Sequence, residues 1–414
     1  MATQAPAPPT GVTSAVKVVS KTWERDSHDL FDFEAHQLHT QTFQVSRSTI
    51  CFRNGTKVEM LNERDPSPSK GDALLRLVQR EGTFWVDKAQ PTSSSKKLWL
   101  VVRDLVSSSH RLQEADVIKL GRFKFRVRQL VSSTCGGLQP ELRLDDTGLI
   151  CCAVEPSADN EALQINKLTC RICLLEGPGE EQDDPLIAPC QCKGSIEYVH
   201  LGCLRHWIKG RLNLSDRPLG SYFYRPLTCE LCKSIYPTYI HTDGGQTRSP
   251  LVEVPWTQPP FIVLENMVRD SQQHTTRGLH VISLAEKELK LGRGHESDVR
   301  IADVSISRCH ATIRFSKGQF LLQDNSSKFG TLVAMKKPRV LEPGVNLSIQ
   351  MGRTVLTLCA QQDPSQATAG SSLNQLPAGG SAQDERALRL SLLTRGQGEG
   401  SAGGQSVSEE AAEA

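Results

Sequence analysis

Eight residues between positions 170 and 232 have the types and the spacing of metal ligands. Seven are cysteines and one is a histidine: Cys170, Cys173, Cys190, Cys192, His200, Cys203, Cys229 and Cys232. Thiolate sulfur and imidazole nitrogen are donors that zinc prefers, and four of them complete a tetrahedral structural site. Pairs separated by two residues suit this use, because a tight turn aims both sulfurs at one point. The set therefore predicts two zinc ions, and a short module whose folding depends on them.

Two plainer interpretations of these cysteines have to be weighed. They are ordinary buried cysteines, or they form a zinc ribbon with a purely structural role. Four correctly spaced pairs are improbable by accident, so zinc binding is the better interpretation. The other six cysteines show no partner spacing, and the adjacent pair Cys151-Cys152 is more simply incidental than a third site.

The bulk composition bounds what surrounds this module. A chain of 414 residues is too long for one core, so two or three domains are expected. The formal net charge of +2 favours neither nucleic acid nor an anionic membrane as a partner. No apolar run reaches the roughly 18 residues of a membrane span. The N-terminus lacks a signal-peptide pattern, so we expect the cytosol or the nucleus, where 13 cysteines do not form a disulfide framework.

The rest of the chain alternates between β-type and linker-type sequence, and the expected fold is multidomain and mainly β. Apolar and polar residues alternate strictly in Ala311-Thr312-Ile313-Arg314-Phe315, as in a half-buried strand. We predict seven segments: a disordered leader (1–15), an all-β domain (16–131), a linker (132–162), the zinc module (163–240), a connector (241–260), a second β domain (261–360) and a disordered tail (361–414).

The two β segments end alike. Ile118 aligns with Ile349, Gly121-Arg122 with Gly352-Arg353, and Val127 with Leu358. This match suggests that both segments share one fold, although the first lacks the binding motifs described below for the second. We therefore expect the first segment to be a degenerate relative that mediates protein contacts.

The run from Ala188 to Trp207 resembles the RING-CH, or RING-variant, zinc-finger family of ubiquitin ligases. The resemblance implies a small α+β cross-brace with interleaved sites. One zinc would be held by Cys170, Cys173, His200 and Cys203, and the other by Cys190, Cys192, Cys229 and Cys232. The members known best carry transmembrane helices after the module, and this chain shows none. Another part of the chain must then choose the substrate.

A PHD finger, which reads histone tails, has the same ligand order. That family places a tryptophan two residues before the seventh ligand, where this chain has Leu227. Instead, Trp207 follows Cys203 by four residues, on one face of a short helix expected from about His200 to Arg211. This arrangement favours a RING-type ligase over a histone reader.

A RING module performs no covalent chemistry; it positions a ubiquitin-conjugating enzyme and its thioester-linked ubiquitin. The resemblance implies that Ile172 and Trp207 form the apolar groove for that enzyme, with Pro189 beside it. Lys233 follows the last ligand, where many RINGs have an arginine that presses on ubiquitin. The plainer interpretation is that Ile172 and Trp207 only pack a small core.

Three motifs in the second β segment are similar to those of forkhead-associated (FHA) domains, which are β-sandwiches that bind phosphothreonine. They occur in the family's order: Leu291-Gly292-Arg293, Ser307-Arg308-Cys309-His310 and Asp324-Asn325-Ser326-Ser327-Lys328-Phe329-Gly330-Thr331. The resemblance implies that Arg293 and Arg308 neutralise the phosphate through charge-assisted hydrogen bonds. Ser307 would donate its hydroxyl.

The same resemblance implies structural roles for Gly292, His310 and Gly330. One position departs from the family, because Phe329 stands where an asparagine usually holds the peptide backbone. Lys328 adds a cation next to it.

Two hypotheses of different classes follow from these motifs. The first is a ubiquitin ligase whose FHA domain docks a phosphothreonine-containing protein. The second is a non-enzymatic zinc-binding adaptor in phosphorylation-dependent signalling. Ile172 and Trp207 separate them, because an adaptor has no need of a groove for a conjugating enzyme.

Overall fold

The computed structural model describes residues 13–25, 29–62, 71–89, 97–134, 142–143, 150–154, 167–179, 184–212, 221–225, 227–242, 247–252, 254–267 and 278–362. Over these ranges the protein is mainly β, with one α-helix, α2 (Leu201–Leu212), in the zinc module. The mainly-β, multidomain fold class predicted from the sequence is confirmed. Most of the expected leader and tail lies outside the described residues.

The N-terminal part of the chain, before the zinc module, contributes ten strands and a single 3-10 turn among the described residues. They are β1 (Thr13–Trp23), β2 (Leu38–Val45), β3 (Thr49–Asn54), β4 (Lys57–Asn62), β5 (Asp72–Arg80), β6 (Thr83–Lys88), β7 (Trp99–Val101), η1 (Val102–Asp104), β8 (Ser109–Arg111), β9 (Val117–Leu120) and β10 (Phe123–Val131).

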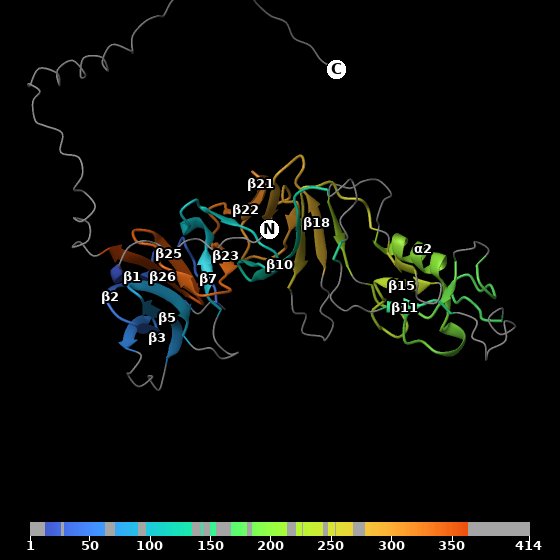
Figure 1. Cartoon of the computed structure of the whole chain (residues 1–414), viewed down its shortest axis with the longest axis horizontal. Helices are drawn as coiled ribbons and strands as arrows, with labels where there is room; N and C mark the ends of the chain where they lie inside the picture. The colour runs from blue at the N-terminus through green and yellow to red at the C-terminus, as the bar shows by residue number, and fades with distance from the viewer. Residues whose placement is uncertain are drawn as a thin grey trace, which may run out of the picture. The chain divides into compact units, whose positions relative to one another are not determined.

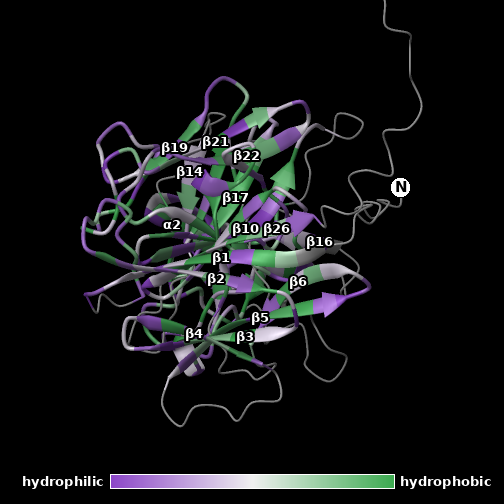
Figure 2. Cartoon of the chain, turned by 90° about the vertical axis from the view of Figure 1, so that its left-hand side faces the viewer, coloured by the Kyte–Doolittle hydropathy of each residue, from purple (hydrophilic) through white to green (hydrophobic). Residues whose placement is uncertain are grey.

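The part after the zinc module contributes a second series. Its strands are β17 (Phe261–Asn266), β18 (Leu279–Ser283), β19 (Leu289–Gly292), β20 (Val299–Arg300), β21 (Ala311–Ser316), β22 (Gln319–Asp324), β23 (Thr331–Ala334), β24 (Arg339–Val340), β25 (Asn346–Met351) and β26 (Thr354–Gln362). Strand β1 illustrates the patterning, since hydrophobic and hydrophilic segments alternate along it in Figure 2.

The two series exchange their last strands. One long sheet has the order β14-β18-β17-β10-β9-β23-β7-β25-β26-β1-β2, so the first strand β1 pairs with the last strand β26, and β17 pairs with β10. Figure 1 shows the blue strand β1 beside the orange-red strands β25 and β26. Two five-stranded sheets, β4-β3-β5-β6-β24 and β20-β19-β21-β22-β8, have corresponding strand orders. In each of them the last strand comes from the other series: β24 joins strands of the first series, and β8 joins strands of the second.

The core of each sandwich therefore draws residues from both ends of the chain. Val18, Leu75 and Phe84 share a core with Ile349 and Leu358. Ile118 and Phe125 share the other core with Ile313 and Leu322. The boundaries 16–131 and 261–360 consequently do not delimit the two sandwiches, which is a correction to the expected domain division.

The physical reason for the exchange lies in the likeness of the two terminal hairpins. β9–β10 and β25–β26 each turn at a glycine with positive φ, Gly121 at 53° and Gly352 at 59°, a backbone conformation that glycine adopts without strain. Their buried residues alternate in the same register, since Ile118 pairs with Phe125 and Ile349 with Leu356. Either hairpin can therefore complete either sandwich, and sequence pattern alone does not decide between them.

A segment between β1 and β2 crosses the outer face of the long sheet. Phe31 is buried there with Trp99, Val101, Leu332 and Val355. Its neighbour Phe33 packs edge-on against Phe31, with ring centroids 4.8 Å apart. This segment, residues 29–35, is called the strap below, and it joins parts of the sheet that belong to the two sandwiches.

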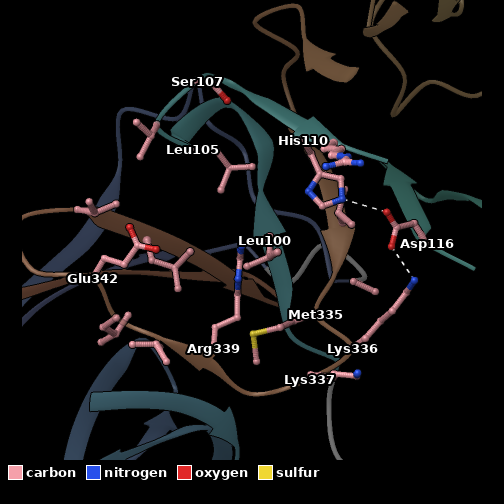
Figure 3. A pocket seen from close by; sticks show the side chains of 18 of the residues that line it. Leu100, Leu105, Ser107, His110, Asp116, Met335, Lys336, Lys337, Arg339 and Glu342 are labelled. Atoms are coloured by element: carbon pink, nitrogen blue, oxygen red, sulfur yellow. Dashed lines mark hydrogen bonds and ion pairs between the residues drawn. The ribbon is translucent and has the colours of Figure 1, made fainter. Parts of the chain in front are cut away.

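The exchange leaves a hollow of about 650 Å³ where the chain passes from β7 to β8 and from β23 to β24 (Figure 3). At its edge, the carboxylate of Asp116 lies 3.0 Å from His110 Nε2 and 2.7 Å from Lys336 Nζ. Burial raises the pKa of Asp116, but the hydrogen bonds from His110, Lys336 and the amide of Gln113 outweigh this and lower it. The three side chains thus tie residues of both series together.

The zinc module is inserted between the paired strands β10 and β17. Its elements are β11 (Ile150–Cys152), β12 (Leu186–Ile187), η2 (Gly194–Ile196), β13 (Val199–His200), α2, β14 (Ser221–Tyr224), β15 (Tyr239–Thr242) and β16 (Thr247–Pro250). Strand β14 pairs with β18 and so extends the long sheet.

The expected linker and connector are not plain spacers. β11 from the first and β16 from the second pair with opposite edges of β15, which forms a three-stranded sheet. Leu251 follows β16 and is fully buried in the module's core. Strand β11 lies in the short apolar run Ile150-Cys151-Cys152-Ala153-Val154.

Candidate zinc centres and phosphopeptide loops

The two Cys-x-x-Cys pairs fold into equivalent turns. The amide of Cys170 donates to the carbonyl of Leu175 and the amide of Cys229 to that of Ser234, both at 2.9 Å. Leu174 and Lys233 occupy matching positions with φ of 64° and 63°. Each turn presents two sulfurs on one side, which is the geometry that a tetrahedral metal site needs.

The eight predicted ligands gather into two clusters in which the ligand atoms lie within 4.8 Å of one another. One cluster consists of Cys170, Cys173, His200 and Cys203, and the other of Cys190, Cys192, Cys229 and Cys232. The sets interleave along the chain as predicted. They fit two zinc ions, because each offers four donors of the preferred type within the space that one ion bridges.

The orientation of His200 supports this fit. Its Nδ1 faces the sulfur of Cys173 at 3.3 Å, while its Nε2 lies 2.8 Å from the carbonyl oxygen of Gly177. Nε2 therefore carries the proton and donates a hydrogen bond to the carbonyl, which leaves Nδ1 with a lone pair for the metal. The histidine is almost fully buried at the end of β13, directly before α2.

Arg171 supports the cluster of four cysteines from outside. Its Nη1 donates to the sulfur of Cys190 at 3.3 Å and to the carbonyl of Ile196 at 2.9 Å. Its Nη2 donates to the hydroxyl of Tyr236 at 3.2 Å. Four thiolates around a divalent ion leave a net negative charge, and this guanidinium lies where it offsets part of that charge.

An apolar pocket of about 200 Å³ lies between the two turns and α2. Ile172, Leu204, Trp207 and Leu231 line it, with Arg171, Cys229, Glu230 and Tyr236. Ile172 and Leu231 occupy equivalent places in the two turns and stay 42% and 59% exposed. Trp207 packs edge-on against Tyr236, with ring centroids 6.2 Å apart. Ile172 and Leu231 therefore leave apolar surface exposed beside the half-buried Trp207.

The structure brings only two of the four predicted groove residues together. Ile172 and Trp207 share this pocket, whereas Pro189 and Lys233 line a different hollow of about 920 Å³ with Cys151 and Cys152. Lys233 Nζ donates to the carbonyl of Glu230 at 2.7 Å. Leu231 was missed by the sequence prediction, although the repeat Leu-Thr-Cys-x-Ile/Leu-Cys at 168–173 and 227–232 marks it as the partner of Ile172.

The predicted phosphate-binding residues of the second β segment lie on adjoining loops. The amide of Arg293 donates to the carbonyl of Ser307 at 3.0 Å, and its Nε donates to that of Ile306 at 3.2 Å. The amide of Lys328 donates to the hydroxyl oxygen of Ser307 at 3.1 Å. Because that oxygen accepts, the hydroxyl hydrogen of Ser307 can be donated elsewhere. Arg293 and Arg308 are exposed.

Buried residues hold these loops in place. His310 Nδ1 accepts from the amide of Ser307 at 3.1 Å, and its Nε2 donates to the carbonyl of Gly330 at 3.2 Å. Burial lowers the pKa of His310, which keeps this neutral tautomer at neutral pH. A Cβ on Gly292 would lie 2.1 Å from the carbonyl oxygen of Arg308, so only glycine allows these loops to approach. The geometry agrees with structural roles for both residues.

The strap occupies the space beside Lys328 and Phe329. Lys328 Nζ lies 3.4 Å from the carboxylate of Asp32, and the amide of Phe33 donates to the carbonyl of Lys328 at 2.9 Å. The ring of Phe329 lies 6.3 Å from that of Trp23, centroid to centroid. The residue that replaces the family's asparagine thus packs against the N-terminal part of the chain.

The first sandwich has an ion pair at the corresponding end. Strands β3 and β5 stand where β19 and β21 stand in the other sandwich, and there Arg53 pairs with Asp72. Arg53 is 8% exposed and also donates to the hydroxyl of Thr354 at 3.1 Å. A carboxylate of the chain already pairs with this buried cation, whereas Arg293 is exposed.

Comparison with known families agrees with both sets of residues. Residues 170–232 match the RING-variant domain, and residues 289–350 match the FHA domain. The chain therefore contains a RING-variant zinc finger and an FHA domain. Each match covers only a part of the chain, and the FHA match spans strands that divide between the two sandwiches.

The similar curated proteins are ubiquitin ligases, and they match over the zinc module. The chain is 44% identical over 64 residues to "E3 ubiquitin-protein ligase MARCHF8" of Homo sapiens, which is 16% of each chain. It is 39% identical over 64 residues to "E3 ubiquitin-protein ligase MARCHF7" of Mus musculus, which is 16% of this chain and 8% of that one. The chain thus spans less than a fifth of the length of these relatives. The part of the chain that the structure describes contains no helix with the length and hydrophobicity of a membrane span.

Proposed function

We propose that this protein is a RING-type ubiquitin ligase that docks a phosphothreonine-containing protein through its FHA loops. The observation that carries the first part is the pocket formed by Ile172, Leu231 and Trp207. Apolar side chains that stay exposed on a rigid, metal-held frame are what a partner protein buries. The similar proteins are named as ubiquitin ligases, which supports a ubiquitin-conjugating enzyme as that partner.

In this mechanism the module contributes position rather than covalent chemistry. Zinc held by the clusters that include Cys170-Cys173 and Cys229-Cys232 would fix the two turns that carry Ile172 and Leu231. The conjugating enzyme buries its contact loops against this pocket, and its thioester-linked ubiquitin is held in a reactive pose. A substrate amine then attacks the thioester carbonyl, and the thiolate of the conjugating enzyme leaves. Lys233 is exposed beside the last ligand, so a contact with ubiquitin remains part of the proposal.

Substrate choice falls to the FHA loops. Arg293, Ser307 and Arg308 offer charge-assisted donors at one end of a sandwich, and this favours a dianionic phosphate over a carboxylate. We expect Arg308→Ala to weaken binding to phosphothreonine peptide libraries by about tenfold or more. Arg300→Ala, an exposed arginine on β20, is the matched control. If neither the wild type nor Arg308→Ala binds the peptides in a phosphate-dependent way, this docking role is excluded.

The ligase itself is tested by reconstitution. The full chain, loaded with zinc, is incubated with ubiquitin, activating enzyme and a panel of conjugating enzymes. Ubiquitin chains with at least one conjugating enzyme are the expected product. Their absence with every member of the panel would favour the alternative, a non-enzymatic zinc-binding adaptor. The proposed location of this activity is the cytosol or the nucleus, where the thiols stay reduced.

A further inference from the structure

A pair of lysines faces each other across the hairpin β9–β10. Lys119 and Lys124 are direct partners in the antiparallel register. The neighbours of Lys119, Ile118 and Leu120, point into the core, so both lysines lie on the outer face of the long sheet. Like charges in directly opposed positions destabilise a strand pair.

Burial makes this repulsion stronger. Lys119 is only 5% exposed, and its ammonium donates to the carbonyl oxygen of Asp29 at 2.8 Å. Lys119 Nζ and Lys124 Nζ lie 5.6 and 5.9 Å from the centroid of the Trp99 ring, so the two ammoniums share one aromatic wall. Burial lowers the pKa of Lys119 to about 8; the charge of Asp29 opposes this effect and that of Lys124 adds to it.

These lysines belong to a pocket of about 240 Å³. It is lined by Asp29, Lys97, Trp99, Lys119, Arg122, Lys124 and Gly352. Four of the seven residues are basic and one is acidic, so the lining carries an excess of positive charge. An anion between the ammoniums would replace the repulsion by attraction, and the burial of Lys119 would strengthen that attraction.

The fold does not require the lysine pair. In the equivalent hairpin β25–β26, Ile349 corresponds to Ile118, and the next residues in register are Gln350 and Val355. A neutral pair therefore occupies the same positions in the other sandwich. Two opposed lysines in one hairpin alone indicate a role beyond folding.

We propose that this pocket binds a phosphoryl group, as inorganic phosphate or as a small phosphate monoester. A tetrahedral dianion matches several convergent cations, with Arg122 able to give paired hydrogen bonds and the lysines acting as point charges. The site is distinct from the FHA loops, because none of Arg293, Ser307 and Arg308 lines it. It stands independently of the ligase and docking functions.

The test uses the full zinc-loaded chain in chloride buffer of constant ionic strength. Inorganic phosphate and glycerol 3-phosphate are titrated separately, and both thermal stability and calorimetric binding are measured. The variant is Lys119→Gln, which introduces the side chain found in the equivalent hairpin. Lys57→Gln, an exposed lysine on β4, is the matched control. We expect phosphate to stabilise the wild type and Lys57→Gln, and to bind Lys119→Gln about tenfold more weakly.

The outcomes separate the sources and the sites. Stabilisation by inorganic phosphate alone identifies the free ion as the ligand, whereas stabilisation by both probes shows that the pocket also accepts a phosphate monoester. An equal response of wild type and Lys119→Gln, or no response to either probe, would overturn the proposal. Arg308→Ala must retain the response, and Lys119→Gln must retain phosphothreonine-peptide binding, if the pocket is separate from the FHA loops.

Discussion

The ammonium of Lys328 lies 3.4 Å from the carboxylate of Asp32, which joins an FHA loop of the second series to the strap of the first. Arg103 extends the same connection, because its guanidinium lies 4.4 Å from the centroid of the Phe33 ring and 2.7 Å from the carboxylate of Asp324. The loop expected to hold a phosphopeptide is thus braced by the other end of the chain.

Removing the charge of Asp32 should strengthen phosphopeptide binding. In Asp32→Asn the Lys328 ammonium loses its carboxylate partner and becomes available to a phosphate. The pair is partly exposed, so we expect a gain of only about threefold, measured by fluorescence anisotropy with a phosphothreonine peptide. The double variant Asp32→Asn/Lys328→Ala should show no gain. Equal gains in both variants would mean that Lys328 takes no part in phosphate binding.

Arg171 should strengthen zinc binding at the four-cysteine site. Arg171→Ala removes the donors to Cys190 and Tyr236, and outer-sphere partners of this kind typically change metal affinity by about 10- to 100-fold. The measurement is zinc release to a chromophoric chelator, in which one of two ions should leave faster. Lys193→Ala, which removes an exposed cation beside Cys192, should release zinc as the wild type does. Release of both ions at unchanged rates would contradict this role.

Metal removal should unfold the zinc module and spare the sandwiches. The module's core contains the ligands Cys170, Cys192 and Cys229, whereas neither sandwich core contains any of the eight. Hydrogen exchange after chelation should show lost protection in β15 and retained protection in β26. Loss in both strands together would show that the inserted module and the sandwiches fold as one cooperative unit.

Lys119 should make stability depend on alkaline pH. Its pKa is about 8 in the folded chain, below the ordinary value of 10.5, so between these values the unfolded chain binds more protons. Stability then rises with pH across that window, by on the order of 3 kcal/mol in total. Asp29, Lys97, Arg122 and Lys124 face the same pocket. Denaturant unfolding at pH 7.5 to 10.5, an interval chosen to bracket those values, should show a rise in the wild type that Lys119→Gln lacks. Parallel curves would contradict this assignment.

The zinc ligands were predictable because their spacing is a local property. A Cys-x-x-Cys turn forms wherever it stands in the chain, and the interleaved pairing followed from the family resemblance. The groove was predicted only in part. Pro189 is adjacent to Cys190 in sequence but lines a different hollow, whereas Leu231 belongs to the pocket because its turn repeats that of Ile172.

The strand exchange was not predictable from pattern. Burial alternates alike in the hairpins that end at Val131 and Gln362, and alternation does not encode which sandwich a hairpin completes. The internal repeat was nevertheless visible at Gly121-Arg122 and Gly352-Arg353. The contact of Phe329, which stands in place of the family's asparagine, was not predictable from the sequence either. Its partner Trp23 is distant along the chain and comes close to it only in the folded structure.

The central claim is that Ile172, Leu231 and Trp207 bind a ubiquitin-conjugating enzyme that carries thioester-linked ubiquitin. Its most direct test is single-turnover discharge of a preformed thioester-linked ubiquitin to free lysine, in the presence of the full zinc-loaded chain. We predict that the wild type accelerates discharge and that Ile172→Ala and Leu231→Ala lose most of the acceleration. Leu174→Ala, an exposed leucine of the same turn outside the pocket, should retain it. Acceleration that is equal in all four proteins, or absent in the wild type with every conjugating enzyme tried, would contradict the account.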